Sequence, residues 1–205
     1  MRNNMMTDRT QILKFAALAC AVLLLGGCMG GQRHPSPPRM TGKIVGNIYQ
    51  SPKGRFSVPV PVSKEVNGRV IHDDAESVLF QDNWGSRIAF RSGAIFTQSP
   101  MQAMLQKEGK EKALTAYLTQ GYSSIVALHF HPEILEGTMS FIYEKPVGPK
   151  TGVAAMIHDK RIYLVETDLL PGVQLLSKSD DASEAERDAW LENRAVELLR
   201  SMQIR

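Results

Sequence analysis

The chain has 205 residues, of which 43% are hydrophobic and 22% are charged, and its formal net charge is +3. This composition excludes an intrinsically disordered chain, a collagen and a multi-pass membrane protein. Its two cysteines, Cys20 and Cys28, both lie in the first 28 residues, so a disulfide-stapled scaffold is excluded as well.

The N-terminal segment has the layout of a secretory signal. Residues 1–14 carry three basic side chains against one acidic side chain, and eleven apolar residues follow from Phe15 to Leu25. As a helix this run would measure roughly 17 Å, which is too short for a hydrocarbon core of about 30 Å. A basic flank followed by a short apolar run is typical of a signal peptide.

The apolar run ends in Leu25-Gly26-Gly27-Cys28, which resembles the lipobox of bacterial lipoproteins. The resemblance covers residues 1–28. It implies cleavage between Gly27 and Cys28, a diacylglyceryl thioether on Cys28 and acylation, for example by palmitate, of the new amino terminus. More than one acyl chain makes membrane anchoring stable. The alternative is an ordinary secretory signal peptide in which a cysteine happens to lie at the cleavage site.

Residue 29 is Met rather than Asp. In enterobacterial lipoproteins an Asp at this place favours retention in the inner membrane. We therefore expect a lipid-anchored, periplasm-facing protein of the cell envelope, with the outer membrane favoured over the inner one.

Removal of residues 1–27 changes the charge and organisation of the chain. Lys and Arg fall from 24 to 21 and Asp and Glu from 21 to 20, which leaves about +1. Neither this charge nor any basic run favours nucleic-acid binding. Residues 28–43 hold the lipidated cysteine and a flexible tether with three Pro and three Gly. Residues 44–205 are enough for one domain.

Pro- and Gly-containing turns predict the first strands. Strands near 44–50 and 55–59 flank Ser51-Pro52-Lys53-Gly54, and Pro59 and Pro61 end this pairing or place it at an edge. A short strand is expected at 70–72. Strands at 77–81 and 86–91 flank a second hairpin turn at 82–85.

A helix is predicted from about residue 100 to 120. Ser99 suits the N-cap, Pro100 the first helical position and Gln102 a capping box, and Gly121 is a stop signal. The apolar side chains of its two halves lie on nearly opposite faces, with Gly109 between them. We expect a kink or break at Gly109, or else two separately buried faces.

The second half of the domain repeats the alternation of strands and helix. Strands are expected at 122–130, 137–144, 152–157 and 161–167, with a tight turn at 158–160. A capping box of Ser183 and Glu186 opens a helix to about residue 203. Trp190 points away from its apolar face and is a candidate contact residue. The apolar face comprises Ala185, Ala189, Leu191, Ala195, Val196, Leu198, Leu199 and Met202.

This order predicts an α+β domain, with a mainly antiparallel sheet of about 6–8 strands and helices packed on it. Residues 49–59, Tyr-Gln-Ser-Pro-Lys-Gly-Arg-Phe-Ser-Val-Pro, resemble the opening of PsbP-like domains, and residues 78–82 resemble their next paired strand. The resemblance implies an α-β-α sandwich and a binding or assembly-assisting role rather than an enzyme. No functional residue is carried over from it.

Two groups of side chains are candidates for metal binding. On a strand His129 and His131 would face the same side and reach one ion, although a site needs a further ligand and Pro132 ends the strand before Glu133. Alternatively, the two histidines mark a solvent-facing strand end. The acidic loop is weaker because His72-Asp73-Asp74 with Glu76 lacks EF-hand spacing, which favours a solvated turn.

The chain has none of the common catalytic signatures: no Gly-x-Ser-x-Gly elbow, no phosphate-binding glycine loop and no His-Glu-x-x-His. We therefore expect a non-enzymatic lipoprotein, without a cofactor, whose domain binds an envelope protein or assists assembly. A periplasmic metal or small-ligand binding protein using His129 and His131 is the alternative. A hydrolase with an unfamiliar site is a third possibility and requires a concave pocket with convergent polar groups.

Overall fold

The computed structural model describes residues 42–60, 69–81, 86–135, 137–168 and 183–205. They belong to one compact unit of the chain, which begins at Arg39. Within these ranges, no helix combines the length and apolar character needed to cross a membrane. The expectations for the signal peptide, for Gly27 and Cys28, for most of the tether and for the turn at 82–85 lie outside the described residues.

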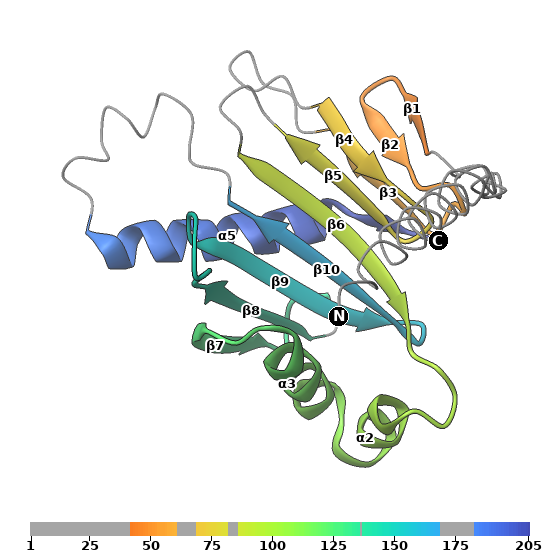
Figure 1. The fold of residues 1–205 in the computed structure, drawn as a ribbon. Coiled ribbons are helices and arrows are strands. Elements are labelled where there is room, and N and C mark those ends of the chain that lie inside the picture. The colour runs from red at the N-terminus through yellow and green to blue at the C-terminus, as the bar shows by residue number, and fades with distance from the viewer. Residues whose placement is uncertain (1–41, 61–68, 82–85, 136, 169–182) are drawn as a thin grey trace, which may run out of the picture. The chain divides into compact units, whose positions relative to one another are not determined.

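The larger of two antiparallel sheets has seven strands in the order β4-β5-β6-β10-β9-β8-β7 (Figure 1). Each strand lies where the sequence predicts one, with shifts only at the ends. The tight turn after β9 is also confirmed, because Asp159 and Lys160 both have positive φ. The strands are β4 (Arg69–Asp73), β5 (Ser77–Gln81), β6 (Arg87–Ala94), β7 (Ile125–His131), β8 (Thr138–Tyr143), β9 (Thr151–His158) and β10 (Arg161–Thr167).

The smaller sheet has four strands in the order β1-β2-β3-β11. They are β1 (Lys43–Val45), β2 (Ile48–Gln50), β3 (Phe56–Pro59) and β11 (Gln203–Ile204). The single strand predicted for 44–50 is wrong: Gly46, with φ of 61°, and Asn47 form a two-residue turn that folds the segment into a hairpin. Strand β11, which follows the last helix and pairs with β3, was not predicted from the sequence.

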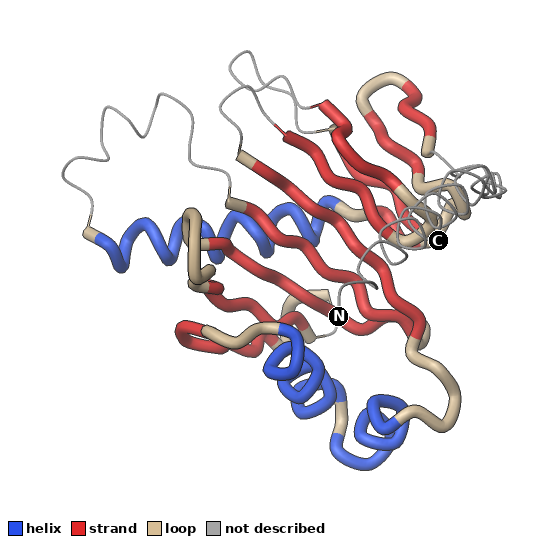
Figure 2. The backbone as a smooth tube through the Cα atoms, in the orientation of Figure 1, coloured by secondary structure: helices blue, strands red, loops and turns tan. Residues whose placement is uncertain are grey.

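The predicted break at Gly109 is confirmed. Helices α2 (Pro100–Glu108) and α3 (Lys110–Gly121) meet at Gly109, where φ is 90° and ψ is 176°, and Figure 2 shows their short connection. Ser99 caps α2 by accepting from the Gln102 N–H at 3.1 Å. The expected capping box is incomplete, because the Ser99 N–H donates to the Phe96 carbonyl and Gln102 Oε1 has no partner.

Helix α5 (Glu184–Ser201) begins at the predicted capping box, in which both reciprocal bonds between Ser183 and Glu186 are present. Its predicted apolar face is correct from Leu191 onward and wrong at Ala185 and Ala189, which are exposed. Trp190 is half-buried.

The helices lie on both sides of the large sheet and create two cores. On one side α5 packs on β8, β9 and β10, and a core including Phe80, Phe90 and Leu199 joins it to the small sheet. On the other side α3 packs on β8 and β9 over Leu118 and Phe141. Every core member among the described residues comes from residue 49 onward, so the hydrophobic interior that these residues form lies within the domain and supports its folding alone.

The conformation of Gly109 gives a test of the helix break. Its φ and ψ fall in a region that is essentially restricted to glycine. We expect Gly109→Ala to lower the free energy of unfolding by about 1–3 kcal/mol, measured by urea denaturation. Gly121→Ala is the matched control, because a methyl group there meets open space and its φ is not positive. If both variants lost the same free energy of unfolding, the glycine-restricted conformation at Gly109 would be wrong.

Candidate binding groove

One half of the large sheet is not covered by any described helix. In Figure 1 α5 runs behind the sheet, whereas α3 lies beside β8 and β9 and α2 packs on α3, so no helix among the described residues covers the front of β4, β5 and β6. Side chains alternate between the two faces of the sheet along β5, which determines which of them lie on the uncovered face. Val78 and Phe80 are buried in the core beside α5, whereas Ser77, Leu79 and Gln81 remain half-exposed on the opposite face.

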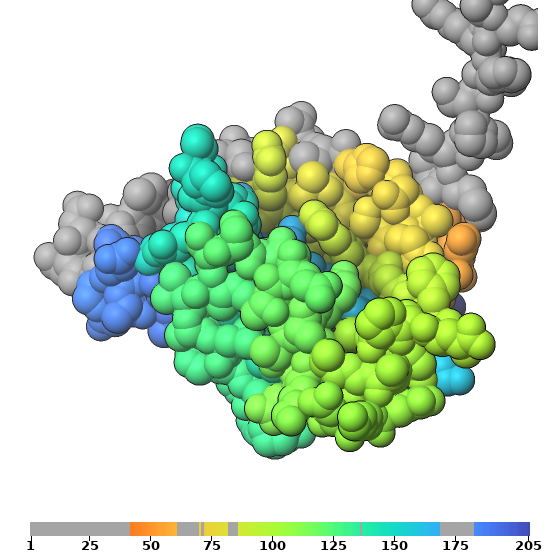
Figure 3. Space-filling view, turned by 60° about the horizontal axis from the view of Figure 1, so that its bottom comes forward, coloured from red at the N-terminus to blue at the C-terminus, as the bar shows by residue number. Residues whose placement is uncertain are grey.

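A groove runs across this open face beside α3. It consists of two adjoining cavities of about 620 and 440 Å³, and both cavities are lined by Ser77, Arg91 and Glu166. Figure 3 shows the hollow between the green helical segment and the yellow strands, with part of the blue chain at its floor. Concave surfaces of this size are typical of binding sites.

The end of the groove next to α3 is aromatic with an apolar floor. Tyr117 is 42% exposed, and Tyr122 and Tyr143 stand beside it. Ile162 and Leu164 of β10 lie beneath them. Tyrosine and arginine are enriched at protein interfaces, because each combines a large contact surface with a polar end.

Glu166 organises the middle of the groove. It accepts hydrogen bonds from the Tyr122 hydroxyl and from Arg91 Nη2, the latter at 3.1 Å. Burial, together with the neighbouring Glu166 carboxylate, raises the pKa of Tyr122 above its ordinary value. The Tyr122 phenol therefore stays neutral and donates a hydrogen bond to Glu166, whose carboxylate would otherwise repel an acidic ligand.

The far end of the groove presents positive charge. Asp168, whose side chain is only 8% exposed, accepts from the backbone N–H of Arg87 and pairs with Lys145 at 3.4 Å. Asp168 thus points inward, whereas Arg87 is exposed and the Arg91 side chain is 58% exposed. The positive charge is confined to this end of the groove, because Asp74 and Glu76, which line the other cavity, have side chains that are 52% and 40% exposed.

The structure places His129 and His131 outside this groove, on β7 at the edge of the sheet. His129 Nδ1 lies 2.6 Å from Glu192 Oε1 of α5, and His131 Nε2 lies 2.7 Å from Ser140 Oγ. The Ser140 hydroxyl donates to the same Glu192 oxygen at 2.6 Å. The two histidines thus belong to one hydrogen-bonded cluster that ties the strand edge to α5.

Glu133, the further ligand considered from the sequence, lies beside His131, with 3.9 Å between Glu133 Oε1 and His131 Nδ1. Across the described part of the chain, no group of three or more His, Cys, Asp or Glu side chains is arranged to hold a metal ion. Glu192 is near both rings, but Ser140, a weaker ligand, stands between it and His131. The cluster does not resemble a hydrolytic serine site either, because Ser140 is fully buried, whereas a catalytic hydroxyl must be accessible to its substrate.

The acidic loop before β5 is held together by internal bonds. Asp73 accepts from the Gly42 N–H and the Tyr49 hydroxyl, and Glu76 pairs with Arg55 at 2.6 Å and with Arg161. Asp74 accepts from the N–H groups of the next turn. Its pKa is lowered because these hydrogen bonds outweigh its partial burial, which acts in the opposite direction. The three carboxylates therefore serve different partners, in agreement with a structural turn.

The groove was not predicted from the sequence. Three residues that line both of its cavities, Ser77, Arg91 and Glu166, come from three different strands. The local signal was the alternation of Arg87, Ala89 and Arg91 along β6.

The described residues define an α+β sandwich domain, with helices on both faces of an antiparallel sheet and an open groove on one of them. No protein-family model matches the chain, and no curated protein matches it. In fold it is similar to the solution structure of cyanobacterial PsbP (CyanoP) from Synechocystis, with 9% identity and a TM-score of 0.46 over 87% of this chain and 100% of that chain. It is also similar to the Ran-binding protein Mog1p of Saccharomyces cerevisiae, with 8% identity and a TM-score of 0.43 over 80% of this chain and 96% of that chain.

Proposed function

We propose that this protein is a lipoprotein of the bacterial cell envelope, anchored through Cys28, whose α+β domain binds another envelope protein through the groove and performs no catalysis. The observation that supports protein binding is the open sheet face, where tyrosines, an apolar floor and exposed arginines line one continuous groove. The lipobox supports the anchor, and the periplasm-facing location follows from it.

The groove chemistry favours binding over catalysis. Its buried carboxylates are engaged by Tyr122, Arg91 and Lys145, so neither is free to act as a general base. His72, at the rim, lies 3.3 Å from Asp74 and has no hydrogen bond to Ser77 among the described contacts. Ser92 donates its hydroxyl to Glu76 Oε2 at 3.0 Å, but Ser92 is buried and Glu76 is also paired with Arg55 and Arg161, so this contact favours a structural role.

Site-specific photo-crosslinking tests the groove as a protein-binding surface. A photoreactive phenylalanine analogue at position 117, inside the groove, is expected to yield a discrete crosslinked species in intact cells. The same analogue at position 96, where Phe96 is 75% exposed outside the groove lining, is the matched control.

Arg91→Glu in the Tyr117 crosslinking background should reduce the crosslinked species about tenfold or more, because it reverses the charge that faces the ligand and leaves Glu166 without its arginine. Equal crosslinking from both positions, or an unchanged species with Arg91→Glu, would contradict the proposal.

The anchor has its own test. Cys28→Ser removes the thiol that would carry the diacylglyceryl group, so we expect loss of labelling by a radioactive or alkyne-tagged fatty acid and accumulation of uncleaved precursor. Cys20→Ser is the control, because this residue lies within the apolar run and would leave with it. Normal lipid labelling of the Cys28→Ser protein would refute the anchor without affecting the groove.

A further inference from the structure

The outer face of the small sheet has two rows of different character. The register aligns Val45, Ile48 and Pro59 across β1, β2 and β3. Val45 is 59% exposed, Pro59 is exposed and Ile48 is half-buried. Two residues away along each strand, the register aligns Lys43, Gln50, Ser57 and Gln203. Because strand residues two apart share a face, an apolar row lies beside a polar row on one surface.

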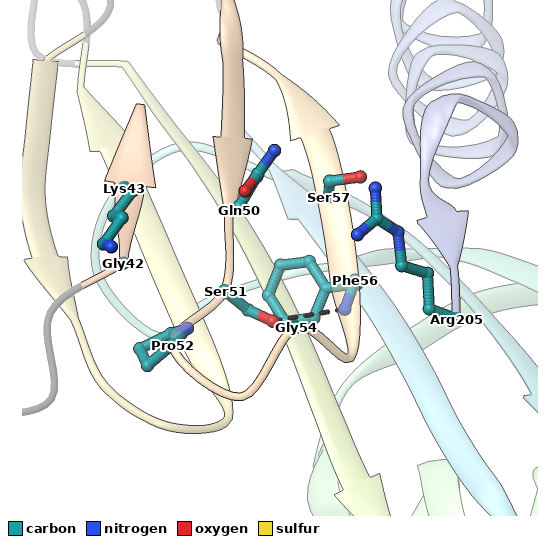
Figure 4. A pocket seen from close by; sticks show the side chains of 9 residues that line it. All are labelled: Gly42, Lys43, Gln50, Ser51, Pro52, Gly54, Phe56, Ser57 and Arg205. Atoms are coloured by element: carbon teal, nitrogen blue, oxygen red, sulfur yellow. Dashed lines mark hydrogen bonds between the residues drawn. The ribbon is translucent and has the colours of Figure 1, made fainter. Parts of the chain in front are cut away.

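A pocket of about 230 Å³ opens along the polar row. Figure 4 shows Lys43 from β1 on one side and Arg205, which follows β11, on the other, with Gln50 and Ser57 between them. Among the described residues that line this pocket, none is acidic. Lys43 and Arg205 are exposed, and Lys53 is exposed in the turn between β2 and β3. The pocket therefore offers the cationic groups of Lys43 and Arg205 to an anion.

We propose that this outer face of the small sheet, with its apolar row and cationic pocket, binds a phospholipid surface that carries anionic headgroups. Lys43 and Arg205 contact the lipid phosphates, and Val45, with Ile48 and Pro59, enters the interfacial region. Basic groups beside exposed apolar side chains are the combination by which peripheral proteins bind anionic membranes.

The position of this face along the chain supports a lipid as the occupant. Lys43 is the first residue of β1, and Cys28 precedes it by only fifteen positions in the sequence. If Cys28 carries the anchor, the outer face of the small sheet is the described surface nearest to the bilayer along the chain. In this respect the inference rests on the proposed function, and it leaves the groove of the large sheet free for a protein partner.

Binding to vesicles tests this inference without the anchor. Residues 29–205, which contain both cores, are expressed without lipid, and their folding is checked by circular dichroism. We expect sedimentation with vesicles of phosphatidylcholine and phosphatidylglycerol, no sedimentation with phosphatidylcholine alone, and weaker binding as salt is raised.

Each basic residue near an anionic membrane contributes about fivefold to binding. Lys43→Glu/Arg205→Glu should therefore weaken binding by at least about 25-fold, and Val45→Asp should also weaken binding to the anionic vesicles, because a charged side chain replaces the apolar one that enters the interfacial region. Lys107→Glu/Lys112→Glu on the exposed surfaces of α2 and α3 carries the same charge change and should keep wild-type binding.

Equal binding by the two double variants would overturn the inference. It would also be overturned if the folded wild-type domain bound neither kind of vesicle, or bound only an acidic peptide such as polyglutamate, since the face would then be a protein-binding surface. Because this domain carries no lipid, these outcomes are independent of the Cys28 labelling experiment.

Discussion

Replacement of Gly152 by alanine is expected to lower the free energy of unfolding by about 3 kcal/mol or more, which would be a large part of the stability of an ordinary domain. Gly152 lies on β9 where α5 crosses the sheet. A Cβ atom there would meet the Leu191 carbonyl oxygen at 2.2 Å and its carbon at 2.6 Å. Both are backbone atoms, so no side-chain rotation relieves the overlap and α5 itself must shift from its core.

Gly93→Ala is the matched control for this prediction. Gly93 also lies in a strand of the large sheet, but a Cβ atom there has nothing within 4 Å and its φ is not positive. We expect this variant to unfold at the wild-type urea concentration or slightly above it. If the two variants had the same urea midpoint, the close approach of α5 to β9 would be wrong.

The domain is also expected to lose stability steeply above pH 10. Burial is the main cause that raises the pKa of Tyr49, Tyr122 and Tyr163, with neighbouring carboxylates adding to it at Tyr49 and Tyr122. An unfolded tyrosine releases its proton near pH 10, whereas these three keep theirs in the fold. The folded state then binds more protons than the unfolded state, so the free energy of unfolding falls by up to about 1.4 kcal/mol per pH unit for each tyrosine.

Lys150 also contributes to the loss of stability at alkaline pH. Hydrogen bonds to Asp188, then Glu184 and Glu144, raise its pKa above the ordinary value, so its contribution is complete below about pH 10 and is lost as the pH rises further. Urea denaturation at a series of alkaline pH values measures the sum of these effects.

Tyr122→Phe isolates one part of the alkaline effect. It removes the phenol that would release a proton on unfolding, so the free energy of unfolding should fall less steeply above pH 10 than in the wild type. Tyr117→Phe, which removes an exposed phenol from the same groove, is the control and should keep the wild-type slope. A Tyr122→Phe protein as steep as the wild type would show that Tyr122 is not protected by the fold.

The strands and helices were predictable where local signals are strong. Turn residues located the hairpins around Pro52 and Asp159, and the change of apolar face at Gly109 located the helix break. Prediction failed at two strands for different reasons. The β1–β2 hairpin had a local signal, Gly46-Asn47, which the prediction of one continuous strand overlooked. In contrast, β11 is a strand only because β3, from a distant part of the chain, lies beside it.

The groove could not be predicted for a related reason. It exists because α3 covers β8 and β9 and leaves β4–β6 open, and no local pattern states where a helix will pack. Ser77, Arg91 and Glu166 meet there only once β5, β6 and β10 are neighbours in the sheet. The histidine pair was correctly identified as sharing one side of a strand, but its partner Glu192 comes from a helix more than sixty residues later.

The pairing of β11 with β3 has a consequence for the order of folding. The Ser57 hydroxyl and the Gln203 side chain are 146 residues apart in sequence, so this contact closes one of the longest loops in the chain. Long-range closures form slowly, because the chain entropy is lost before the contact is gained. We expect the small sheet to acquire protection from hydrogen exchange after the β9–β10 hairpin, as pulse labelling during refolding would show. The membrane-facing surface proposed above would then be the last part of the domain to take shape.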